Sequence, residues 1–108
     1  MTDQDHPIFV ESIRYIKNKL GFTGLEPLQQ DVLERLIHSS GDFQIVSMLR
    51  FSFDACQKGL AALKAGAPIL TDTAMAATAV KPMALRTLQT PVRNVLEWAP
   101  IQAPNGYT

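Results

Sequence analysis

The feature of the sequence that most constrains the fold is a pair of segments that each begin with proline and end with glycine. The first runs from Pro7 to Gly21 and the second from Pro27 to Gly41, and both carry apolar residues at helical spacing. Proline suits the first turn of a helix, and glycine suits the residue that closes one. We therefore expect the chain to open with two helices joined by a short turn.

The second segment has two faces when it is drawn as a helical wheel. One half is apolar and contains Leu28, Val32, Leu33, Leu36 and Ile37. The other half is polar and contains Gln30, Asp31, Glu34, Arg35 and His38. His38 is therefore expected to point away from the apolar face, near the end of the helix. Imidazole titrates near neutrality, so this side chain is a candidate proton donor, and the alternative is an ordinary solvated histidine.

The rest of the chain alternates between helical and extended patterns. A third helix is expected at residues 53–65, with Ser52 as its N-cap, Asp54 in its first turn and Gly66 at its end. The expected strands are residues 67–71 and 92–96, with helical segments at 73–80 and 82–88 between them and a loop from residue 98 onward. This order predicts an α/β fold with parallel strands. Two strands would leave unpaired edges, so we expect the sheet to be incomplete in the sequence as given.

Length and charge exclude several classes of protein. A chain of 108 residues is expected to form one domain at most. Its ten basic and ten acidic side chains cancel, so it lacks the basic surplus that sequence-independent nucleic-acid binding needs. No apolar run is long enough to span a membrane, and the acidic residues 1–5 have no apolar stretch behind them, so no secretory signal is expected. With Cys56 as the sole cysteine, the sequence indicates a protein of the reducing cytoplasm.

Few residue combinations suggest chemistry by themselves. Cys56 and His38 could form a thiol nucleophile and its base, but Cys56 also fits an ordinary core stripe, which we favour. No metal site and no cofactor are expected, because ligand clusters and glycine-rich phosphate loops are both missing from the sequence. Asp72 follows the first expected strand, where α/β proteins bind ligands, although it could instead cap the next helix. Ser12 and Met75 are, taken alone, an exposed hydroxyl and a packing residue.

Four stretches of the sequence form a recognisable pattern, namely residues 6–13, 34–42, 49–52 and 59–75. Together they resemble the precorrin-8X methylmutases (precorrin isomerases), a family of cobalamin biosynthesis. The last stretch is the most specific, because it contains the order ALKAGAPIL-x-D-x-x-M. The resemblance covers about residues 6–108 and weakens after Val80.

The resemblance implies an isomerase that moves a methyl group from ring carbon 11 to carbon 12 of precorrin-8X or cobalt-precorrin-8, giving hydrogenobyrinate or cobyrinate. This 1,5-sigmatropic shift requires protonation of the corrinoid macrocycle and a rigid pocket, and no metal or redox cofactor. The family's catalytic histidine falls on His38, and a serine that contacts the substrate falls on Ser12. Asp72 and Met75 fall near the substrate pocket. Family members are homodimers with a mainly parallel sheet flanked by helices.

The family's proteins are about twice as long as this chain, which ends at Thr108 just before a substrate-binding arginine of the family pattern. The resemblance therefore implies that residues 1–108 are the N-terminal part of a single methylmutase domain. Two alternatives remain open: a truncated remnant that binds corrinoids without catalysis, or half of a split enzyme that pairs with a complementary chain. A lesser alternative is an unrelated helical adaptor.

Overall fold

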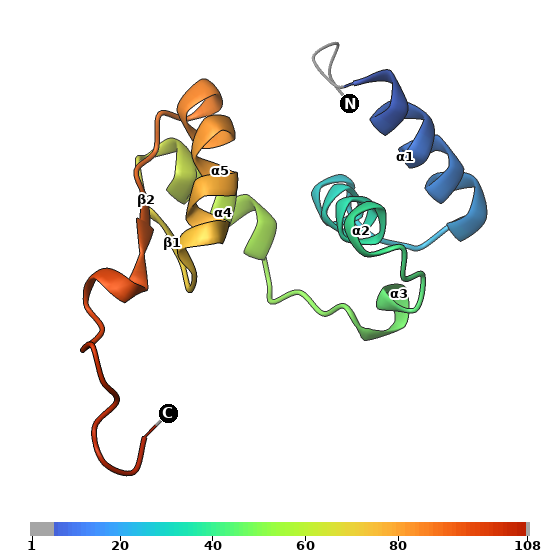
Figure 1. Cartoon of the computed structure of the whole chain (residues 1–108). Coiled ribbons are helices and arrows are strands. Elements are labelled where there is room, and N and C mark those ends of the chain that lie inside the picture. The colour runs from blue at the N-terminus through green and yellow to red at the C-terminus, as the bar shows by residue number, and fades with distance from the viewer. Residues whose placement is uncertain (1–5, 108) are drawn as a thin grey trace. The chain divides into compact units, whose positions relative to one another are not determined.

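The computed structural model describes residues 6–107, and the chain divides into two compact units at residues 57 and 58 (Figure 1). Unit 1 contains residues 1–57 and unit 2 contains residues 58–108. The expectation that both belong to one domain stays a prediction. Among the helices of residues 6–107, none combines the length and the apolar character needed to cross a membrane.

Unit 1 is built on two long helices, α1 (Pro7–Leu20) and α2 (Pro27–Ser40), followed by the short helix α3 (Ile45–Met48). Each long helix begins with proline and is closed by a glycine with positive φ, which is +64° at Gly21 and +70° at Gly41. A residue without Cβ adopts this backbone conformation without steric cost. The expected bounds of both helices are therefore confirmed. The short helix α3 was not expected, because its four residues are too few to show a period.

The core of unit 1 lies between α1 and α2, which pack against each other (Figure 1). Its buried side chains are Ile13, Ile16, Leu33 and Ile37. Partly buried apolar residues surround them, namely Phe9, Leu20, Leu25, Phe43, Ile45 and Leu49. This apolar contact is what holds the two helices together.

The helical wheel of α2 predicted the wrong faces for three residues. Glu34, expected on the polar face, is only 2% exposed, whereas Val32 and Leu36, expected on the apolar face, are exposed. The buried residues of α2 are Leu33, Glu34 and Ile37, which come from both the apolar and the polar half of the wheel. The Glu34 carboxylate is tolerated there because its Oε2 accepts a 2.8 Å hydrogen bond from Gln30 and its Oε1 lies 3.8 Å from the Lys17 ammonium.

Helix α4 (Ala55–Lys64) spans the division between the units and begins later than expected. Asp54 was predicted to lie in its first turn, but its φ of +56° places it in the left-handed region, where no right-handed helix can start. Ser52 does not serve as its N-cap; the Ser52 carbonyl accepts a turn hydrogen bond from the Ala55 amide at 3.1 Å. Gly66, with φ of +94°, follows the end of the helix as predicted.

Unit 2 contains a two-stranded parallel sheet, in which Ile69 lies opposite Val92 and Thr71 opposite Asn94. Its elements are β1 (Ile69–Thr71), α5 (Ala74–Thr87), β2 (Val92–Asn94) and the 3₁₀ helix η1 (Val95–Glu97). Helix α5 connects the two strands and packs against both of them (Figure 1). Its buried side chains are Ala77 and Ala84. The predicted α/β class with parallel strands is confirmed.

Three details of unit 2 differ from the sequence-based expectation. The two expected helical segments are one helix, α5, with Pro82 inside it. The first strand starts at Ile69 rather than residue 67, and the second ends at Asn94 because Val95 and Leu96 belong to η1. The Asn94 side chain accepts a hydrogen bond from the Leu96 amide at 3.0 Å, and this cap turns the chain out of the strand.

Candidate active site

The structure brings together two of the predicted site residues, Ser12 and His38. The Ser12 Oγ and the His38 Nδ1 are 2.7 Å apart, which is hydrogen-bonding distance, although the residues are 26 positions apart in the chain. Their sequence neighbours Ile13 and Ile37 are both buried in the core between α1 and α2. Packing of these neighbours places Ser12 and His38 at the edge of the same helix interface, where their side chains meet.

Two further side chains complete this group. The ring of Phe9 lies edge-to-face with the His38 ring, with centroids 4.9 Å apart and planes at 84°. The guanidinium carbon of Arg35 lies 4.5 Å from the centroid of the Phe9 ring, a cation–π distance. Phe9 precedes Ser12 by three residues on α1, and Arg35 precedes His38 by three on α2, so each pair shares a helix face. We call Phe9, Ser12, Arg35 and His38 the histidine cluster.

The histidine cluster leaves one ring nitrogen of His38 open. Within residues 6–107, His38 Nε2 has no hydrogen-bond partner, and the residue is exposed. A serine hydroxyl can donate or accept a hydrogen bond, so Ser12 can hold either neutral tautomer of the imidazole. If Ser12 donates to Nδ1, then Nε2 carries a proton to give away; if Nδ1 donates to Ser12, then Nε2 can take one up. The arrangement therefore supports proton transfer at Nε2 in either direction.

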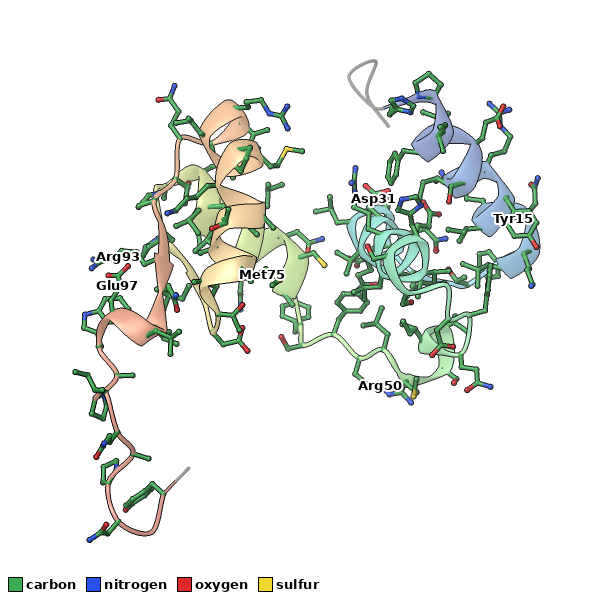
Figure 2. All side chains as sticks on the ribbon, in the orientation of Figure 1. Tyr15, Asp31, Arg50, Met75, Arg93 and Glu97 are labelled. Atoms are coloured by element: carbon green, nitrogen blue, oxygen red, sulfur yellow. The ribbon has the colours of Figure 1, made fainter. Side chains whose placement is uncertain are left out.

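The surface beside the cluster is shallow. A depression of about 50 Å³ is lined by Phe9, Ile13, Asp31, Glu34 and Arg35. Figure 2 labels Asp31 on α2. Pockets that enclose small organic ligands are several times larger, at about 300–1,000 Å³. This depression is therefore too small to enclose an organic ligand, and the exposed His38 lies on an open surface of the described part of unit 1.

The other two predicted site residues, Asp72 and Met75, belong to unit 2. Asp72 directly follows β1 and is exposed, and Met75 is 83% exposed in the first turn of α5 (Figure 2). The alternative interpretation of Asp72 as a helix cap is wrong, because the cap of α5 is Thr73, whose Oγ1 accepts a 3.1 Å hydrogen bond from the Ala76 amide. Their role in contacting a substrate stays a prediction.

Comparison with known proteins decides the family. The model of the precorrin-8X methylmutase family matches residues 7–106, nearly the whole sequence. The chain belongs to this family. All four predicted site residues, Ser12, His38, Asp72 and Met75, lie within the part that matches the precorrin-8X methylmutase family.

Two curated relatives carry the name cobalt-precorrin-8 methylmutase. The protein from Synechocystis sp. is 27% identical over 118 aligned residues, which cover 96% of this chain and 54% of the relative. The protein from Priestia megaterium is 31% identical over 75 residues, which cover 69% of this chain and 33% of the relative. The chain thus spans about half, or less, of the length of these methylmutases. No solved structure matches.

Phe9 and Arg35 were not predicted from the sequence as members of the site. Their spacing contained the signal, because a residue three positions from a candidate on a helix lies on the same face. Arg35 was recognised only as part of the polar half of α2, and Phe9 only as part of a stretch resembling the methylmutases. Cys56, the alternative nucleophile, is half-buried. In the part of the chain that the structure describes, no three His, Cys, Asp or Glu residues are grouped so that they could hold a metal ion.

Proposed function

We propose that this chain takes part in the isomerisation of precorrin-8X, or of its cobalt-containing counterpart, in cobalamin biosynthesis. In this reaction the bond between a methyl group and ring carbon 11 breaks while a bond to carbon 12 forms within the same molecule. The observation that supports the proposal is the 2.7 Å contact between Ser12 and His38, in a chain of the methylmutase family. It leaves a solvent-facing imidazole nitrogen on an open face that a flat macrocycle can approach.

His38 acts as the proton donor to the macrocycle through Nε2 and takes the proton back after the methyl group has moved. Since the substrate rearranges internally, the chain supplies no nucleophile and exchanges no electrons with it. Ser12 holds the imidazole through Nδ1, so that Nε2 keeps one direction and one protonation state while the substrate is bound. A positioned general acid contributes about 10²–10⁴-fold to a rate.

The remaining roles are drawn from the family. Asp72 and Met75 contact the corrinoid at the end of β1, where α/β sheets bind ligands. The working form is a homodimer in the cytoplasm. Light scattering of the purified protein checks the dimer, and a mass equal to that of one chain contradicts it. Fractionation of the source cells checks the location, and recovery with the membranes or outside the cell contradicts it.

The function is tested by mixing the purified chain with precorrin-8X, or with cobalt-precorrin-8, and following the visible absorption spectrum. The assay is run with the chain alone and with a separately expressed C-terminal half of the Synechocystis relative. Turnover by the chain alone, or turnover restored by the added half, supports the proposal. Binding of substrate without turnover in both arms contradicts it and indicates a non-catalytic corrinoid binder.

The two histidines of the chain provide a matched control for this assay. His38→Ala is expected to lower the rate by about 100-fold or more, since the general acid is removed. His6→Asn removes the other imidazole but retains a side chain that can cap α1 in place of the His6 Nδ1, which accepts from the Ile8 amide at 3.1 Å. This control is expected to keep the wild-type rate. Wild-type turnover in His38→Ala would overturn the proposed role of His38.

A further inference from the structure

We propose that Phe9 is a positioning residue, which fixes the plane of the His38 imidazole and so directs Nε2. The proposal rests on the proposed function of His38, and it assigns to Phe9 a role beyond filling the core. The contact that carries it is the perpendicular packing of the two rings, at 4.9 Å between centroids and 84° between planes.

One hydrogen bond does not fix an imidazole. The rotation of a histidine ring about χ2 is broad, and the bond from Ser12 to Nδ1 leaves the ring free to pivot about that nitrogen. A pivot of this kind sweeps Nε2 through space and bends the Ser12–Nδ1 hydrogen bond, which weakens its hold on a single tautomer. The Phe9 ring, standing at right angles to the imidazole, blocks this motion, and perpendicular aromatic pairs are also intrinsically favourable. Two contacts at different parts of the ring therefore define its plane.

Phe9 is itself held from the opposite helix. The guanidinium carbon of Arg35, on α2, lies 4.5 Å from the centroid of the Phe9 ring. Phe9 on α1 therefore contacts both Arg35 and His38, which are three residues apart on α2. The four residues of the histidine cluster link the two helices through the Phe9–Arg35, Phe9–His38 and Ser12–His38 contacts. The orientation of His38 is thereby tied to the packing of α1 on α2.

The same unit contains a matched control for the loss of an aromatic ring. Phe43 packs edge-to-face on Tyr15, with centroids 6.4 Å apart and planes at 79°, and the Lys19 ammonium lies 4.3 Å from its centroid. Like Phe9, Phe43 is partly buried against the core of unit 1. Among residues 6–107, the ring and cation contacts of Phe43 are with Tyr15 and Lys19, and His38 is not one of its partners. Substitution of Phe43 therefore removes a similar aromatic and cationic contact without altering the histidine cluster.

The test measures His38 by ¹⁵N nuclear magnetic resonance in the whole chain carrying Phe9→Leu, Phe9→Tyr or Phe43→Leu. The Nδ1 and Nε2 chemical shifts report the tautomer populations of His38. We expect Phe9→Leu to move these shifts toward those of a freely exchanging histidine, Phe9→Tyr to retain the wild-type shifts, and Phe43→Leu to leave them unchanged. If Phe9→Leu does not fold, Phe9→Met, with a long flexible apolar side chain, takes its place.

Kinetics supply a second readout. In the isomerisation assay, Phe9→Leu is expected to lower kcat by about 10- to 100-fold with little change in KM, because misplacing a catalytic group costs this much. Wild-type ¹⁵N shifts in Phe9→Leu, or equal changes in Phe43→Leu, would overturn the proposal. Because the ¹⁵N readout does not need turnover, it judges the role of Phe9 even if His38→Ala shows that the proposed function is wrong.

Discussion

Truncation of Leu33 is expected to separate the two helices that carry the candidate active site. Leu33 is 0% exposed and lies at the centre of the core between α1 and α2. Leu36, three residues further along α2, is 39% exposed. The same substitution, leucine to alanine, can therefore be made at a buried position and at a solvent-exposed position of one helix. The change in helix propensity is the same at both, so it cancels from the comparison.

The expected magnitudes follow from burial. Removing three buried carbon atoms from Leu33 forfeits about 2.5 kcal/mol of transfer free energy. The cavity left behind raises the expected loss toward about 3–4 kcal/mol. At Leu36 the removed atoms were partly in water and no closed cavity forms, so about 1 kcal/mol is expected. The two variants are therefore expected to differ by about 2 kcal/mol. This corresponds to about a 30-fold difference in the equilibrium between the state in which α1 and α2 are packed together and the state in which they are separated.

Amide hydrogen exchange of α1 and α2 measures this equilibrium locally, which suits a chain with two compact units. Leu33→Ala is expected to speed exchange of the α1 and α2 amides far more than Leu36→Ala, and to broaden the His38 ring signals. Equal protection in the two variants would refute the assignment of Leu33 to the core and of Leu36 to the surface.

Three smaller perturbations test local features of unit 2. Thr73→Ala is expected to lower the thermal stability of α5 by about 1 kcal/mol through loss of its cap, whereas Asp72→Ala is expected to leave it nearly unchanged; equal losses in circular dichroism melts would contradict this. Gln89→Gly is expected to raise the free energy of unfolding by about 0.5–1 kcal/mol, because Gln89 has a φ of +53°, which glycine adopts without steric cost. A lower melting temperature in this variant would argue against backbone strain at Gln89. The side-chain hydrogen bond from Arg93 lowers the pKa of Glu97 below its ordinary value of 4.5, so the stabilisation from this pair is complete above 4.5 and is lost as the pH falls through the lowered pKa. Titration of the Glu97 carboxyl signal should show Arg93→Gln bringing this pKa back toward 4.5, and an unchanged titration would show that Arg93 is not the cause.

The ends of the helices in unit 1 could be predicted from the sequence because they depend on backbone preferences within one turn. Pro7 and Pro27 mark the first helical turns, and Gly21 and Gly41 adopt the positive φ that closes each helix. The parallel pairing of the two strands likewise followed from the alternation of strand and helix. Where the local preference was misleading, as at Asp54, the left-handed backbone at one residue moved the start of α4.

The candidate site was only partly predictable. The resemblance to the methylmutases singled out Ser12 and His38, but no pattern in the sequence states that two residues 26 positions apart share a hydrogen bond. That contact, and the perpendicular packing of Phe9 on His38, exist because α1 and α2 pack on each other through one particular face of each helix. The face of a helix that is buried depends on how the helix is rotated against its neighbour, which its own periodicity does not determine.

For this protein, local sequence preferences were enough to predict the alternation of helix and strand after the first two helices, the ends of those two helices and the membership of a family. Tertiary structure decided that Glu34 is buried while Leu36 is exposed, and that His38 lies against Ser12 and Phe9. The two kinds of feature differ in how far apart in the chain the interacting atoms lie. Caps and turns are settled by atoms a few bonds apart, whereas burial and the geometry of the site are settled by contacts between segments that the chain must first fold together.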